Sequence, residues 1–275
     1  LVNSLYLELL PSKIQRLTSN LMHSKAEDKD SFGLTLGYRY DPNKDFSSGL
    51  GIYYYDDDLD LNDMGYLILN DRLQFNGRTQ FKKTDFSKDS SLRARLFEIG
   101  YGSKFNADST RESSNMAFKI ETNFKNLSEI KTEIFYRSTG RNTRITRGSN
   151  LSPYILMPKG VGGYIEFTGP RRPLYIYSLR HERGKGSEYS PEIGWKNSSR
   201  AYIKFMPLDT LSFNMMYQYA EESNWLNWLE GNLLATYERK QRTSILELEW
   251  FHNNKHELRV KAQMVAFTGR NPAPY

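Results

Sequence analysis

Charged or polar side chains recur at every second position along several stretches of this 275-residue chain. The alternate residues from Arg72 to Lys82 are Arg, Gln, Asn, Arg, Gln and Lys, and those from Glu257 to Gln263 are Glu, Arg, Lys and Gln. Because successive side chains of a β-strand point to opposite faces, each run would place its charges on one face. Such a face can attract ions of opposite sign or form cross-strand ion pairs.

The acidic segment Asp56–Asp63 is the second group of residues that could do chemistry. Alternate carboxylates at Asp56, Asp58 and Asp60 are the candidate ligands for a calcium ion. An EF-hand beginning at Asp58 would need Gly at its sixth position and Glu at its twelfth, where this chain has Asp63 and Leu69. The segment is therefore interpreted as a solvated turn, and we predict no metal site and no cofactor.

Residues that commonly carry catalysis form no recognised motif. The histidines His23, His181, His252 and His256 do not belong to an HExxH sequence, and the chain has no GxSxG elbow and no P-loop. The chain also has no cysteine, which removes thiolate zinc sites and cysteine nucleophiles. We predict that the protein is not an enzyme. A hydrolase that assembles His181 or His252 with serine and acidic residues from separate strands is the third functional hypothesis.

The alternating charges require strands to position them. In the stretch Ser244–Phe267 an apolar set of side chains alternates with a charged set, and Asn253-Asn254 between its halves is typical of a hairpin turn. From Ser31 onward similar alternation predicts about fourteen strands, with a bulge near Glu98 where the phase changes. Some predicted connections have two to four residues and others exceed ten, as in outer-membrane barrels.

The strand pattern is not clear in residues 1–30 or in Glu221–Gly231. Residues 1–30 fit either a short helix interrupted by Pro11 or two irregular strands, and they are treated as a poorly defined N-terminal segment. Glu221–Gly231 is predicted to be a loop. Its residues Trp225 and Trp228 could stack on sugar rings, but anchoring at a membrane interface is the preferred interpretation.

Composition narrows the class of protein. The chain is 38% hydrophobic with a mean hydropathy of −0.68, and no stretch approaches the roughly 18–20 consecutive apolar residues that a membrane helix needs. Aromatic residues make up 14%, including 19 Tyr and 15 Phe, as expected where aromatic girdles mark the membrane interfaces. The net charge of +6 is spread along the chain without a nucleic-acid-binding motif, so no nucleic-acid partner is predicted.

These observations predict an all-β fold, an antiparallel transmembrane β-barrel of the outer-membrane type formed by residues 31–275, complete or part of a larger barrel. A soluble β-sandwich is the alternative. The residues predicted to line the lumen are Arg72, Arg78, Lys82, Lys119, Glu121, Lys131, Glu133, Arg137, Glu247, Glu249, Glu257, Arg259 and Lys261, and Arg93 and Arg95 are counted with the same face. The residues predicted to face lipid are Leu211, Phe213, Met215, Tyr217, Leu246, Leu248, Trp250, Leu258 and Val260.

Short sequences in the first third and near the end of the chain resemble a known family. They are Asn62-Asp63-Met64-Gly65-Tyr66-Leu67 with Asn70-Asp71, and the ending from Trp250-Phe251 through His256 to Gln263. They resemble the C-terminal barrel of an uncharacterised bacterial outer-membrane family that pairs it with an N-terminal domain similar to family-9 carbohydrate-binding modules. The resemblance covers the barrel half of the family and implies a longer protein.

The predicted function follows from the polar interior. The first hypothesis is a channel or transport component of the Gram-negative outer membrane, with a porin-like, cation-rich lumen that favours anionic solutes. The second is a plugged barrel that anchors a periplasmic or extracellular partner domain. A charge ladder that only stabilises the barrel would fit the same residues as well as the conduit does. The predicted partners are the lipid bilayer, lipopolysaccharide, and an N-terminal module or other subunits of an outer-membrane complex.

Overall fold

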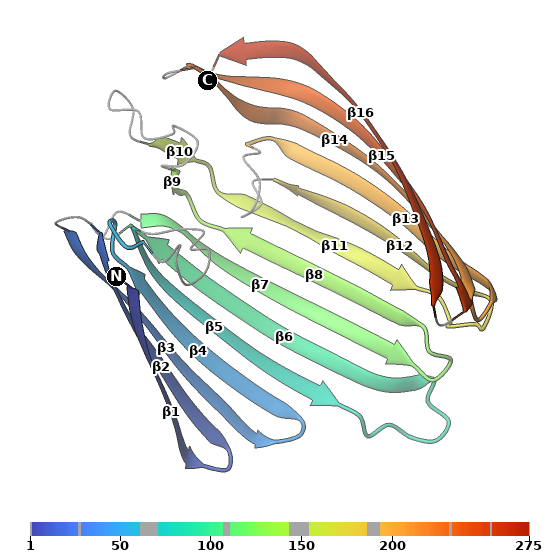
Figure 1. Cartoon of the computed structure of the whole chain (residues 1–275), viewed down its shortest axis with the longest axis horizontal. Helices are drawn as coiled ribbons and strands as arrows, with labels where there is room; N and C mark the ends of the chain where they lie inside the picture. Colours follow the sequence, from blue (N-terminus) through green and yellow to red (C-terminus); the bar gives the residue numbers. More distant parts are fainter. Residues whose placement is uncertain are drawn as a thin grey trace.

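A computed structural model describes residues 2–26, 29–60, 71–106, 111–142, 154–185, 193–230, 233–253 and 255–274. These residues form one fourteen-stranded antiparallel sheet and one two-stranded ribbon, so the predicted all-β antiparallel architecture is confirmed (Figure 1). No helix in this described part of the chain is long and apolar enough to cross a membrane.

The large sheet is a meander in which each strand pairs with its neighbours in the chain. Only β9 and β10 leave it, and they pair with each other between β8 and β11. The bounds are β1 Val2–Ser12, β2 Gln15–Ala26, β3 Lys29–Asn43, β4 Phe46–Tyr55, β5 Arg72–Lys83, β6 Leu92–Phe105, β7 Arg111–Phe124, β8 Glu129–Arg137, β9 Gly140–Asn142, β10 Ile155–Met157, β11 Gly160–Thr168, β12 Tyr175–Lys185, β13 Trp195–Leu208, β14 Leu211–Glu230, β15 Leu233–Asn253 and β16 His256–Pro274.

The two ends of the sheet differ in the length of their connections (Figure 1). The long connections, residues 56–71, 138–159 and 186–194, all lie at one end, because alternate connections of a meander share an end. The other end carries connections of two to eight residues, which are 13–14, 44–45, 84–91, 125–128, 169–174, 209–210 and 254–255. The shorter connections 27–28, 106–110 and 231–232 lie at the same end as the three long ones. We call the two ends the long-connection end and the short-connection end. In the described residues β1 and β16 are the two edges of the sheet and do not pair with each other.

Some strands differ from their predicted places. Residues 1–30 contain β1 and β2, which pair along most of their length from Val2↔Ser24 to Leu9↔Leu17. The prediction of a loop at Glu221–Gly231 is wrong, because β14 continues to Glu230 beside β15 after a bulge between Glu222 and Trp225. The sheet has fourteen strands, the number expected, but two of them lie in the segment left undefined.

The register divides the side chains into two faces, which we call the polar face and the apolar face. Residues directly opposite each other on paired strands point to the same side. One row of opposite residues crosses seven strands from Gln80 on β5 through Glu98, Lys119, Glu133, Tyr164 and Glu182 to Ser198 on β13. A row of the other parity runs through Tyr177, Ile203, Met215, Leu246 and Ala262.

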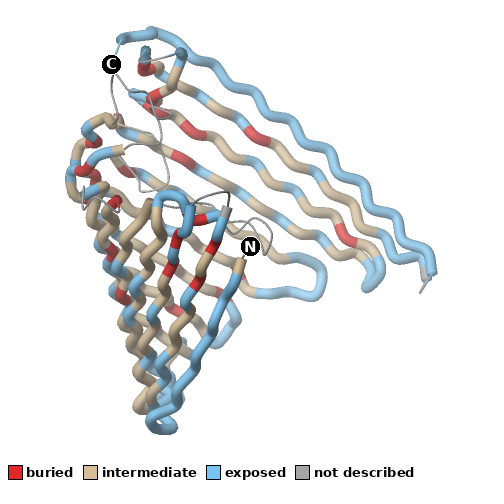
Figure 2. Tube along the Cα trace, turned by 60° about the vertical axis from the view of Figure 1, so that its left-hand side comes forward, coloured by how far each residue is buried: buried red, intermediate tan, exposed pale blue. Residues whose placement is uncertain are grey.

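The polar face is the more sheltered one. Side chains of Glu98, Glu121 and Glu166 are 19%, 22% and 18% exposed, whereas Ile134, Ile165 and Leu179 of the apolar face are 54–60% exposed. Side chains converge on the inside of a bent sheet and diverge on its outside, and the sheet is strongly curved (Figure 2). The polar face is therefore the concave face, and large apolar side chains cover the convex face.

Fully buried apolar side chains are few in the described residues, and several gather at the long-connection end. Leu59, in the segment that follows β4, is 2% exposed. Its methyl group lies 2.8 Å from the point where a Cβ on Gly33 would be, close to Met22 and Tyr55. The Asp60 amide also donates to Ser24 Oγ at 3.1 Å. This segment therefore folds over the polar face at the ends of β2–β4.

Candidate functional site on the polar face

The structure places the residues predicted to line a lumen on the polar face. Lys119 lies opposite Glu133, Glu121 opposite Lys131, and Glu247 opposite Lys261. Rows of directly opposite residues show that these pairs share one face. One row runs from Glu133 through Tyr164 and Glu182 to β13. Another runs from Lys204 on the same side of β13 through Asn214 to Glu247. Alternation along β5, β8, β15 and β16 adds the remaining members, Arg72, Arg78, Lys82, Arg137, Glu249, Glu257 and Arg259.

An ion-pair network on this face joins β11, β12 and β13. Arg180 donates to Glu182 at 3.0 Å and to Glu166 at 3.4 Å. Arg200 reaches the other oxygen of Glu166 at 3.6 Å. The Arg180 guanidinium also lies 3.6 Å from the ring centroid of Tyr164, which is a close cation–π contact. In this network two cations and two carboxylates neutralise each other.

Further ion pairs follow the face in both directions from this network. On the β7–β8 side Lys131 contacts Glu129 at 2.8 Å and Lys119 contacts Glu121 at 3.7 Å. On the β14–β16 side Lys261 contacts Glu247 at 2.7 Å and Lys204 contacts Glu249 at 3.9 Å, and Arg259 pairs with Glu257 on its own strand. Most of the charges predicted for a lumen are therefore paired across or along the strands.

Replacing Arg180 by methionine is expected to lower the free energy of unfolding by about 1–3 kcal/mol, because Glu166 and Glu182 lose their shared, partly buried cation. The same change at the more exposed Arg200, which has the longer contact with Glu166, is expected to cost less. Urea unfolding of the folded chain in detergent would measure both values. An equal cost for the two variants would contradict the central role of Arg180.

Two arginines depart from the predicted arrangement. Arg137 is on the polar face but only 5% exposed, and its guanidinium donates to the carbonyl of Pro158 at 3.2 Å, so it fastens the chain that returns from β10. Arg95 lies opposite Lys83 and Thr122, on the apolar side. The bulge predicted near Glu98 occurs instead between Leu92 and Ala94, and this difference accounts for the misplaced side chain.

The residues predicted to face lipid all lie on the apolar face. Leu211 is opposite Trp250, which is opposite Leu258, and Phe213, Leu248 and Val260 form the next row. Met215, Tyr217 and Leu246 are 48–52% exposed despite their apolar character. Along β14 the apolar set extends from Leu211 to Tyr219, which matches the roughly 9–11 residues of a tilted membrane-crossing strand.

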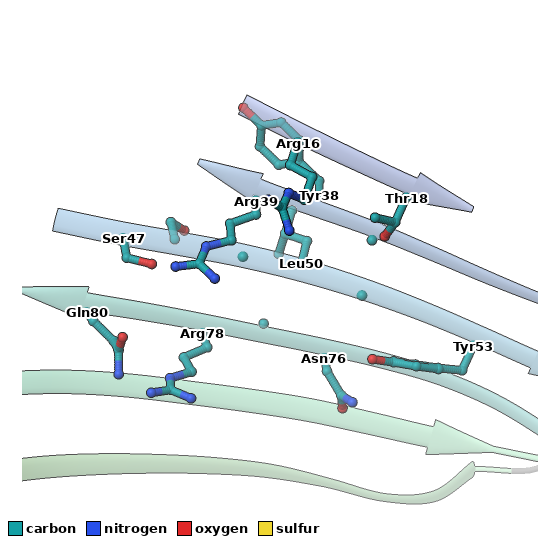
Figure 3. Close-up of a pocket in the computed structure, with 15 residues that line it drawn as sticks. Arg16, Thr18, Tyr38, Arg39, Ser47, Leu50, Tyr53, Asn76, Arg78 and Gln80 are labelled. Atoms are coloured by element: carbon teal, nitrogen blue, oxygen red, sulfur yellow. The ribbon is translucent and has the colours of Figure 1, made fainter. Parts of the chain in front are cut away.

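A groove on the polar face lies among β2, β3, β4 and β5 near the short-connection end (Figure 3). It has a volume of about 550 Å³ and includes Arg16, Arg39 and Arg78. Arg78 is among the predicted lumen residues, but Arg16 lies in the segment that sequence patterns left undefined. The signal that could have located it is the alternation of Arg16, Thr18 and Asn20 with Leu17 and Leu21.

The structure adds little support for the metal site and the hydrolase that the sequence offered as alternatives. The described residues contain no group of three or more His, Asp or Glu side chains that could hold a metal ion. Asp58 instead pairs with Lys29 at 2.7 Å. His181 Nδ1 lies 2.9 Å from Ser199 Oγ on the apolar face, and in the described part of the chain no acidic side chain hydrogen-bonds to this imidazole.

The fold and this face together define the class of protein, an all-β chain built on one curved antiparallel meander with a polar concave face. Comparisons with protein families, curated proteins and solved structures found no match. The segment from Asn62 to Asn70, which carries part of the family resemblance, lies outside the described residues.

Proposed function

We propose that the chain forms a membrane-spanning β-barrel of a bacterial outer membrane, or a section of one, and acts as a channel or transport component. The polar face lines the lumen and the apolar face contacts lipid. The distribution of side chains supports this proposal best. A water-soluble sheet buries its apolar face, whereas here the apolar side chains cover the exposed convex face and the charges occupy the sheltered concave face.

The connections support the same proposal. Outer-membrane barrels have short periplasmic turns and long extracellular loops. The segregation of 56–71, 138–159 and 186–194 at one end fits this asymmetry and orients the chain with that end outward. The lipid bilayer and lipopolysaccharide are then its surroundings. An N-terminal module or other subunits of an outer-membrane complex are its proposed protein partners.

Single-channel recording tests the conduit. The folded chain, reconstituted in a planar lipid bilayer, is expected to conduct discrete ionic currents. The folded state is verified beforehand by the β-sheet circular dichroism signal and by altered gel mobility before heating. Folded protein that inserts but carries no current at any voltage would contradict a conduit.

A structural anchor is the second candidate, and two observations favour it. The charges of the polar face are extensively paired, as expected for a ladder that stabilises a closed interior. In addition, Leu59 and its neighbours cover the face at the long-connection end of β2–β4. Insertion without current in the bilayer experiment would select the anchor over the channel.

A further inference from the structure

The groove at β2–β5 has a floor with few side chains. Gly37, Gly49 and Gly51 lie on the polar face of two adjacent strands. A Cβ at Gly37 would meet Thr18 Oγ1 at 2.5 Å, and one at Gly51 would meet the ring of Tyr53 at 3.0 Å. At Gly49 the nearest atom is the Tyr38 carbonyl oxygen at 3.5 Å, so this position opens directly into the groove.

Arginines flank this opening on both sides. Arg39 on β3 lies opposite Gly49, and Arg78 on β5 lies opposite Gly49 from the other side. Neighbouring strands are about 4.8 Å apart, so the two arginine backbones are separated by roughly 10 Å. Arg16 continues the row, because it lies opposite Arg39 on β2. Figure 3 shows these side chains around the groove.

The guanidinium groups keep donors available for a ligand. Arg39 contacts Asp41 through Nε at 2.6 Å, and Arg78 contacts Glu98 through one terminal nitrogen at 3.0 Å. Each guanidinium has five N–H groups in total. Both arginine side chains are about 60% exposed. Exposed ion pairs are weak because water screens them, so a ligand can compete with the carboxylates.

The groove differs in this respect from the ion-pair network on β11–β13. There Glu166 contacts both Arg180 and Arg200, and Arg180 is 28% exposed and stacked on Tyr164. A solute would have to break several contacts to reach those cations. At Gly49 the approach is open, and within the described residues Arg39 and Arg78 each form an ion pair with one carboxylate.

We propose that the groove is a binding site for small hydrophilic solutes that carry an oxyanion, either a carboxylate or a phosphate group. The oxyanion lies over Gly49 and accepts hydrogen bonds from Arg39 and Arg78, each of which matches the planar, two-pronged geometry of such groups. The rest of the solute lies towards Thr18 and Tyr53. A volume of about 550 Å³ is within the roughly 300–1,000 Å³ of small-molecule sites.

This inference rests on the proposed function, because the same face would line the conduit, and it names the class of solute. Isothermal titration calorimetry of the full chain, folded in detergent, tests it without requiring a current. The probes are glucuronate, inorganic phosphate and glucose. Glucuronate or phosphate is expected to bind and glucose is not. Binding of both anions assigns recognition to the oxyanion itself, and binding of one assigns the site to carboxylates or to phosphates.

Two variants locate the binding site. Replacing Arg39 and Arg78 together by glutamine is expected to weaken anion binding about tenfold or more, because the oxyanion loses both of its charged hydrogen-bond donors. Gly49→Leu keeps both arginines but fills the opening, and it is expected to cause a similar loss. Arg200→Gln removes a cation of the same face outside the groove and is expected to leave the affinity unchanged.

The proposal would be overturned by three results: no binding of either anion to the wild-type chain at millimolar concentration, equal binding of glucose, or equal weakening by Arg200→Gln. Conductance and binding can fail independently. Anion binding by a chain that carries no current would contradict the conduit and leave this site standing. A chain that conducts but binds no anion would contradict this binding site and leave the conduit standing.

Discussion

Replacing Met215 by arginine is expected to prevent stable insertion of the chain into a lipid bilayer, whereas the same substitution at the adjacent Met216 is expected to leave insertion intact. The two residues are neighbours on β14 and belong to opposite faces. Met215 lies in the apolar row between Ile203 and Leu246, and Met216 lies opposite Tyr202 and Ile245 on the polar face. A cation at the middle of a lipid-facing strand costs about 2–4 kcal/mol, but one that faces a lumen meets water or counter-charges.

The experiment is folding into phosphatidylcholine vesicles, followed by gel mobility before heating and by urea titration. The pair of variants is matched in residue type, strand and depth, so only the face differs. If the protein were soluble, Met215→Arg would be expected to leave folding intact, because a residue that is 52% exposed to water tolerates arginine. Normal insertion of Met215→Arg, or equal loss for both variants, would contradict the assignment of lipid to the apolar face.

Sequence alternation predicted the faces well where strands are regular. In β14 and β15 the apolar positions Leu211, Phe213, Leu246 and Leu248 repeat with period two, and the register places them in shared rows. Those assignments need only the parity of each residue. For this reason the polar and apolar sets could be predicted without knowing the length of any strand.

Parity fails where a bulge changes the phase. Arg95 was assigned to the polar face because the phase change was predicted near Glu98, but the register shift lies between Leu92 and Ala94. Local sequence does not fix the position of a bulge, because a bulge is defined by pairing: two residues of the bulged strand lie opposite one residue of its partner. The loop predicted at Glu221–Gly231 failed similarly, since pairing of Trp225 with Tyr237 and Trp228 with Leu234 extends β14 beyond its regular pattern.

The groove could not be predicted because it depends on three strands at once. Arg39, Gly49 and Arg78 are separated by connections along the chain, and only the pairing of β3, β4 and β5 places them in one row. The same is true of Glu166, Arg180 and Arg200. Each residue of these two clusters lies in a strand with ordinary alternation of polar and apolar side chains. Neither the spacing of the charged residues along the chain nor the composition indicates which charges become paired.

If the chain forms the proposed conduit, replacing Arg72 and Arg78 together by glutamate is expected to reverse its ion selectivity from anions to cations. Both residues lie on the polar face of β5, and the double variant changes the charge of that face by four units. Fixed charges along a narrow aqueous path attract counter-ions and repel ions of like sign. The reversal potential under a KCl gradient measures the change and is expected to change sign.

The matched control is the double variant Arg171→Glu and Arg172→Glu, which has the same net charge but alters the exposed connection between β11 and β12. At physiological ionic strength the Debye length is about 8 Å, so charges at this connection are screened from most of the polar face. The control is expected to retain anion preference. Arg78→Gln, which removes charge without adding any, is expected to give intermediate selectivity. If the two variants with changes in β5 conduct with the same selectivity as the wild-type chain and the control, β5 does not line the ion path.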